Sequence, residues 1–265
     1  MIPDDFRNYE EIDAIYQQRH KAGMVNEPYI VRVKNGNQTL LFFGARHSND
    51  ASDPQVQAIE KEWKQFVADT DTPKIAFCEG GAPPVGKTRE EAIRRYSESG
   101  LLTWLAKQDG IKVRSPEPNK TQEIDFLFAQ GFNATQIMTY YFGRQMLQWA
   151  RRDYKNKPDW EAYARHLIAD YGLLHQWEGN NLTLRMVLRM YEEHEGRAFD
   201  PKDEQTLYDL SNPSSSPVSA VSGLCRDISI LRAVTRSWQA GRSTFAVYGS
   251  GHAIVLERAL LKLGH

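Results

Sequence analysis

The chain has 265 residues, of which 41% are hydrophobic and 25% are charged. These are the proportions of an ordinary globular protein, so disordered and fibrous classes are excluded. Thirty-three Lys and Arg balance 34 Asp and Glu, and the net charge of −1 gives no support to nucleic acid as a partner. At ~100–200 residues per domain, the length favours one enlarged domain or a domain that carries an insertion.

Cysteine content and hydropathy indicate the compartment. Cys78 and Cys225 are too few for a disulfide scaffold or a Cys-rich zinc site. The polar N-terminus lacks the apolar segment of a signal peptide, and no apolar stretch reaches the ~18–20 residues of a membrane helix. We therefore expect a cytoplasmic protein with no membrane partner.

The first part of the chain predicts two helices and a hairpin. Asn35-Gly36 is a strong two-residue turn signal between two apolar segments. Asp53 is expected to cap the second helix, with Pro54 in its first turn. The expected helices are 4–22 and 55–68, and the expected strands are 29–33 and 39–43.

Apolar strands then alternate with helical patterns, which is typical of a parallel α/β sheet. From about 120 to 209 no strand is apparent, and aromatic residues recur at helical spacing. We therefore expect a single α/β domain over 1–265, with a mostly parallel central sheet flanked by helices and a helical insertion, or cap, before the last core strand. The remaining expected elements are strands 74–78, 111–113 and 243–248, helices 89–97, 101–107, 224–240 and 253–263, a break at Gly100, and a Ser/Pro-rich loop, 211–217.

Two histidines occupy the same place in two strand–loop–helix units. Gly44–His47 and Gly249–His252 are both Gly-x-x-His, and each lies between an apolar strand and a helix. Glu79 and Glu117 follow two further strands, and Glu98 is a weaker candidate on a helix. Residues just past the carboxyl ends of strands line the ligand crevice of open α/β sheets.

Imidazole and carboxylate groups are the ligands of transition-metal sites that lack thiolates. A divalent ion with three protein ligands would keep an open position for an activated water. Each histidine taken singly is better explained as a helix cap or a turn residue. Two copies at matching positions, together with two strand-end glutamates, favour a metal site instead.

These motifs resemble the TraB/Tiki-type superfamily, which includes erythromycin esterase-like, ChaN-like and GumN-like proteins. The resemblance covers about 40–125 and 223–264. It rests on the first Gly-x-x-His, on Glu79 after the second core strand, and on Val247–His252. Arg226 and Asp227, expected to open the helix before the last strand, are similar to an Arg-Asp pair of the family.

The resemblance implies an α/β core with a site at the strand ends. It implies that His47, Glu79 and His252 are the metal ligands or the catalytic core, and that Arg226 and Asp227 orient or stabilise it. Members of the superfamily differ in activity. Tiki-like proteins resemble metal-dependent peptidases, erythromycin esterase-like proteins resemble metal-free hydrolases with a histidine base, and ChaN-like proteins bind haem.

The leading hypothesis is a hydrolase of a peptide, amide or ester bond in a peptide or small-molecule substrate. It would use manganese, cobalt or zinc, with Glu117 or a second glutamate as general base. The alternatives are a metal-free esterase-like protein and a protein that binds haem or another apolar ligand through the helical insertion. Arg46 disfavours the metal-free mechanism, because erythromycin esterase-like members tend to have a glutamate near the first histidine. Further ligand contacts are expected from Arg46, Ser250, Tyr140 and Tyr141.

A third hypothesis is nucleotide binding, because residues 81–88 satisfy the pattern Gly-x-x-x-x-Gly-Lys-Thr. Such a loop binds phosphate through successive backbone N–H groups, and Pro83 and Pro84 have none. No apolar strand that ends in Asp supplies the second motif of such sites. We therefore expect Thr88 to cap a helix instead.

Overall fold

The structure is a computed structural model that describes residues 5–21, 28–151, 157–172 and 182–264. It divides the chain into two compact units. The first unit comprises Met1–Glu117 and Asp227–His265, and the second comprises Pro118–Arg226. The first and last residues of the predicted helix 4–22 lie outside the described residues.

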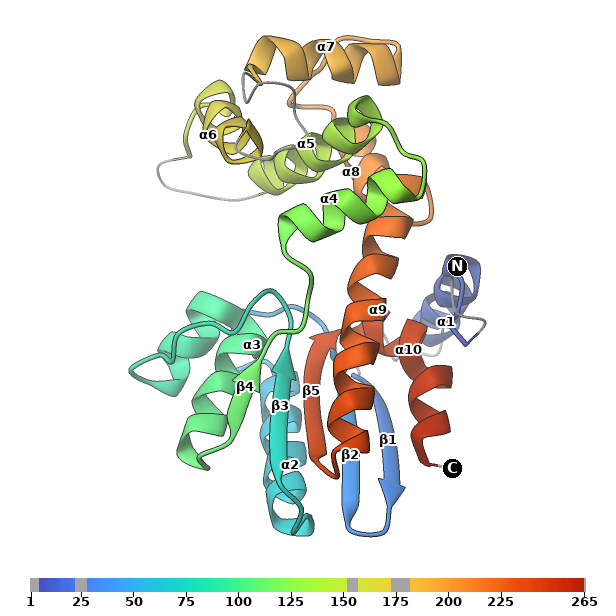
Figure 1. Ribbon diagram of the computed structural model, residues 1–265. Coiled ribbons are helices and arrows are strands. Elements are labelled where there is room, and N and C mark those ends of the chain that lie inside the picture. Colours follow the sequence, from blue (N-terminus) through green and yellow to red (C-terminus); the bar gives the residue numbers. More distant parts are fainter. Residues whose placement is uncertain (1–4, 22–27, 152–156, 173–181, 265) are drawn as a thin grey trace. The chain divides into compact units, whose positions relative to one another are not determined.

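The first unit is built on a five-stranded sheet in the order β1-β2-β5-β3-β4. The predicted α/β class is confirmed, because β2, β5, β3 and β4 are parallel and only the edge strand β1 is antiparallel to its neighbour (Figure 1). The strands are β1 (Tyr29–Asn35), β2 (Gln38–Ala45), β3 (Lys74–Cys78), β4 (Lys112–Arg114) and β5 (Ser243–Gly249).

Helices cover both faces of this sheet. The helices α2 (Pro54–Asp69) and α3 (Arg89–Gln108) lie on one face (Figure 1), and their apolar side chains join those of the strands in one core cluster. On the other face lie α10 (Ser250–Leu261) and the part of α9 (Pro217–Gln239) that begins at Asp227. The remaining elements of this unit are α1 (Tyr9–Lys21) and the short 3-10 helix η2 (Lys262–Gly264).

Local sequence signals account for several of these elements. Gly36, with φ of +56°, forms the hairpin turn as its sequence predicts. The Asp53 side chain accepts a hydrogen bond from the Gln55 N–H at 3.0 Å and caps α2, with Pro54 in the first helical position. Both predictions are confirmed.

The predicted break between two helices exists, but it lies before Gly100. The backbone of α3 leaves the helical conformation at Tyr96 and Ser97, and Ser97 has φ of +48°. Gly100 is needed for a different reason, since a Cβ there would lie 2.1 Å from the Ala92 carbonyl oxygen. The interruption changes the direction of the chain immediately before Glu98.

Two helices near the C-terminus begin earlier than their predicted positions. Because α9 starts at Pro217, Arg226 and Asp227 lie within this helix and not at its opening. Since α10 starts at Ser250, His252 lies in its first turn. The sequence does not reveal the start of α10, because Gly249 occupies the N-cap position without any side-chain hydrogen bond to mark it.

The second unit is helical, as predicted for the insertion, and its described residues contain no strand. The central helix α5 contacts α7 and α8. The Ser/Pro-rich loop forms a hydrogen-bonded turn, in which the Ser216 N–H donates to the Asn212 carbonyl at 2.9 Å. The helices are α4 (Lys120–Ala129), α5 (Ala134–Arg151), α6 (Trp160–Gly172), α7 (Leu184–Glu195), α8 (Glu204–Ser211) and the first part of α9.

Throughout the described ranges, no helix combines the length and the apolar character that crossing a membrane requires.

The strained backbone at Ser97 makes a prediction about stability. Its positive φ suits glycine, and a non-glycine residue in such a conformation costs about 1 kcal/mol. We expect Ser97→Gly to raise the free energy of unfolding by about that amount in urea titrations. Ser97→Ala is the matched control and should bring no such gain, because alanine keeps the Cβ. Equal effects of the two variants would contradict the assignment of strain.

Candidate functional site

The strand order brings the two Gly-x-x-His motifs to neighbouring strand ends. β2 and β5 are parallel partners, and Ala45 pairs with Gly249 at their carboxyl ends. β3 lies on the other side of β5, where Cys78 pairs with Val247. His47, His252 and Glu79 therefore leave the same edge of the sheet from three adjacent strands.

The carboxylate of Glu79 lies between the two histidines. Its Oε2 is 3.8 Å from His47 Nε2, and its Oε1 is 3.6 Å from His252 Nε2. The Gly249 N–H donates a hydrogen bond to Oε2 at 2.6 Å. This donor is at the N-terminus of α10, where the helix dipole favours a negative charge.

His252 is held by a buried carboxylate on its far side. Its Nδ1 lies 2.6 Å from Asp227 Oδ1, and only 12% of the His252 side chain is exposed. The structure thus places Asp227 beside His252. Because Asp227 engages Nδ1, Nε2 is the nitrogen directed toward Glu79.

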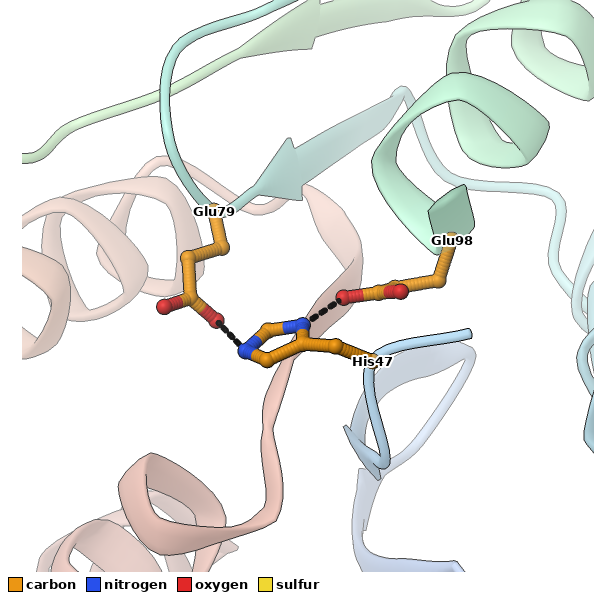
Figure 2. A group of neighbouring side chains, drawn as sticks. All are labelled: His47, Glu79 and Glu98. Carbon is orange, nitrogen blue, oxygen red and sulfur yellow. Dashed lines mark hydrogen bonds and ion pairs between the residues drawn. The ribbon is translucent and has the colours of Figure 1, made fainter. Parts of the chain in front are cut away.

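His47 has an equivalent partner, Glu98. His47 Nδ1 lies 2.5 Å from Glu98 Oε1, and Figure 2 shows the ring between Glu98 on one side and Glu79 on the other. The Glu98 side chain is 3% exposed, and its second oxygen has no hydrogen-bond partner among the described residues. By contrast, 61% of the His47 side chain is exposed. The two histidines therefore share one arrangement but differ in access to solvent.

The Glu98 hydrogen bond raises the pKa of His47 above its ordinary value. Burial opposes this change, whereas the negative charges of Glu98 and Glu79 reinforce it. Glu98 is the weaker candidate in the sequence because glutamate is common on helix surfaces. The sequence feature that indicates Glu98 is its position two residues before Gly100, where the helical pattern is interrupted.

Glu117 also reaches the site, from the segment after β4. Its Oε2 accepts a hydrogen bond from the Gly80 N–H at 2.9 Å. In the described chain, two sets of three side chains have ligand atoms within 4.8 Å of one another. Glu79 belongs to both sets, whereas each set contains only one of the two histidines. The sets are His47, Glu79 and Glu98, and Glu79, Glu117 and His252.

Each glycine that opens a Gly-x-x-His motif makes room for the other motif. A Cβ on Gly44 would lie 2.8 Å from Ala253 Cβ, so Gly44 permits the close approach of α10 to β2. A Cβ on Gly249 would lie 3.2 Å from Glu79 Oε2 and 3.4 Å from His47 Nε2. Gly249 thus leaves open the space beside Glu79 and His47.

The other predicted ligand contacts of this unit have structural partners. Arg46 forms an ion pair with Asp53 at 2.7 Å, which ties the loop after β2 to the start of α2. The Ser250 hydroxyl lies 2.7 Å from the Tyr16 hydroxyl of α1. Tyr16 is thus a neighbour of the second motif that no sequence pattern indicated.

The remaining predicted residues belong to the second unit. Tyr140 and Tyr141 are both buried there, and the Tyr140 hydroxyl lies 2.9 Å from the Ser222 hydroxyl. Arg226 is close enough to Arg144 for their charges to interact. Arg226 and Asp227 are consecutive on α9, so their side chains leave the helix in different directions.

Thr88 has the structural role that its sequence predicts, and Cys78 is a core residue. The Thr88 hydroxyl accepts a hydrogen bond from the Glu91 N–H at 3.1 Å and caps α3, as expected for the end of segment 81–88. Cys78 is buried in the core of the first unit. Burial raises the pKa of its thiol to about 12, so the thiol is protonated at neutral pH.

No protein-family model matches the chain, and comparisons with curated proteins and with solved structures find no match either. The resemblance to the TraB/Tiki-type superfamily therefore stays a prediction from short motifs. A function has to be inferred from the geometry of the site itself.

The pairing of His47 with Glu98 predicts a measurable change in titration. In protein treated with a chelator, Glu98→Gln should lower the pKa of His47, because glutamine retains a hydrogen-bond acceptor but removes the negative charge. NMR titration of the His47 ring measures this directly. Glu90→Gln, an exposed glutamate on the same helix, is the control and should leave the titration unchanged. An unaltered pKa in Glu98→Gln would show that this contact does not control His47.

Proposed function

We propose that the protein is a metal-dependent hydrolase whose divalent ion is held by Glu79, Glu117 and His252. The observation that carries this proposal is the convergence of these three side chains, with ligand atoms within 4.8 Å of one another. Two carboxylates and one imidazole form a donor set that suits manganese, cobalt or zinc. Glu98, the third member of the other set, is engaged with His47 Nδ1 and faces away from His47 Nε2.

The surroundings of these side chains fit a bound ion. Asp227 fixes Nδ1 of His252, which is the outer contact that metal-binding histidines typically make. The absence of a Cβ on Gly249 keeps the space beside Glu79 open. A bound divalent ion would supply Lewis acidity, which polarises a substrate carbonyl and makes water a stronger nucleophile.

His47 is the residue suited to proton transfer. Its Nε2 lies 3.8 Å from Glu79 Oε2, and its exposed ring can meet water and substrate. Glu98 stabilises the protonated form of the ring. In hydrolysis, His47 Nε2 would accept a proton from the attacking water and return it to the leaving nitrogen or oxygen as the scissile bond breaks.

The sequence analysis favours a different assignment, in which the roles of His47 and Glu117 are exchanged. There, His47 joins Glu79 and His252 as a ligand, and Glu117 acts as the base. The closeness of His47 Nε2 to Glu79 is also consistent with that arrangement. Removal of each histidine in turn separates the two assignments.

We expect cobalt binding to distinguish His252 from His47. His252→Ala should weaken Co²⁺ binding by at least about 100-fold, because it removes a ligand, whereas His47→Ala should change it by less than about threefold. Calorimetric titration of the chelator-treated protein measures both affinities, with the exposed His166→Ala as control. Loss of binding in both site variants would support the assignment from sequence. Failure of Co²⁺, Mn²⁺ and Zn²⁺ to bind the unaltered protein would reject the metal site.

Hydrolase activity requires a separate test. We expect the protein to hydrolyse members of a panel of p-nitrophenyl esters and fluorogenic peptides when Co²⁺ or Mn²⁺ is added, and to lose this activity in EDTA. His47→Ala should lower the rate by about 10²–10⁴-fold while cobalt remains bound. Full activity of His47→Ala would contradict its role as the proton acceptor.

A metal-free hydrolase is the second candidate, and the His47–Glu98 contact favours it specifically. A histidine held by a buried carboxylate can act as a base without any ion. Activity that persists in EDTA and disappears in Glu98→Gln would support this candidate. Binding of haem and of nucleotide stay predictions from sequence, tested by a Soret titration and by the effect of ATP on thermal stability.

A further inference from the structure

A polar cavity lies on the first unit, beside the edge strand β4. Its volume is about 350 Å³. Three arginines line it, and Arg114 is distant in the sequence from the other two. Arg114 belongs to β4, Arg236 lies near the end of α9, and Arg242 directly precedes β5.

These three arginines differ from several other arginines of the described chain, which form ion pairs. Arg46 and Arg89, for example, form ion pairs with Asp53 and Glu60. Among the described residues, no carboxylate forms an ion pair with Arg114, Arg236 or Arg242, and none of the described residues lining the cavity is acidic. All three arginines are exposed and line one cavity, in a chain whose net charge is only −1.

Like charges that share one cavity repel each other unless an anion lies between them. Arginine is well matched to phosphate, because its planar N–H donors bind two oxygens at once. The hydroxyl-bearing residues Ser115 and Ser237 line the same cavity and offer neutral donors. The cavity is also lined by Pro116 and Ala233, which are partly exposed and provide an apolar surface for an organic group.

We infer that this cavity binds the phosphate group of a small phosphorylated molecule, with Arg114, Arg236 and Arg242 as its ligands. Three positive charges match a phosphate monoester or a diphosphate better than a singly charged carboxylate. No residue of the Gly81–Thr88 segment lines the cavity, and the two are connected by a hydrogen bond from the Gly81 N–H to Ser115 Oγ at 3.1 Å. The inference does not depend on the proposed hydrolase function.

Calorimetric titration of the full chain at constant ionic strength tests the inference. The probes are inorganic phosphate, pyrophosphate and AMP, with citrate as a carboxylate of similar charge. We expect pyrophosphate or AMP to bind with a dissociation constant below about 1 mM. Stronger binding of AMP than of phosphate would indicate that the apolar surface takes part, whereas equal binding would indicate a site for the phosphate group alone.

The variants Arg114→Ala and Arg236→Ala should each weaken binding by at least about tenfold, because each removes a charged hydrogen-bond donor. Arg232→Ala is the matched control, since Arg232 is exposed on α9 one turn before Arg236 and does not line the cavity. It should change the affinity by less than about twofold. Equal weakening by all three variants, preference for citrate, or no binding of any phosphate probe would overturn the inference.

Discussion

The candidate site depends on the insertion of β5 between β2 and β3. In a parallel sheet, neighbouring strands end at the same edge, so this order brings His47, Glu79 and the first turn of α10 together. The Gly249 N–H then holds Glu79 in place between the histidines. If β5 were at an edge of the sheet, one histidine would lose its position beside this carboxylate.

Close packing at the strand ends is as important as their order. Gly44 allows α10 to approach β2, and this approach sets the position of His252. Gly249 leaves room for Glu79 and His47. The two Gly-x-x-His motifs are therefore complementary as well as similar, because the glycine of each accommodates the segment that contains the other.

The two histidines share one electrostatic arrangement, and their different exposure to solvent is the basis of the different roles proposed for them. Both have Nδ1 engaged by a nearly buried carboxylate, and both direct Nε2 toward Glu79. His252 is nearly enclosed, which suits a fixed ligand, whereas most of the His47 side chain is exposed, which suits proton exchange with water and substrate. The four carboxylates of the cluster, Glu79, Glu98, Glu117 and Asp227, make it rich in the oxygen donors that divalent cations bind.

The sequence by itself determined the α/β class, the hairpin at Gly36, the cap of α2 and the helical character of the insertion. These features follow from short-range preferences, such as hydrophobic periodicity and turn chemistry. It also predicted that His47, Glu79, Glu117 and His252 follow the ends of strands, because strand-end positions are recognisable from the apolar segments before them.

The tertiary structure alone decided the order of the strands and the partners of the histidines. Glu98 is 51 residues from His47 in the chain, and Asp227 is 25 residues from His252. No local preference encodes such contacts, because they arise when separate helices pack against one sheet. The cavity lined by Arg114, Arg236 and Arg242 has the same origin, since only the folded chain brings Arg114 to the other two arginines.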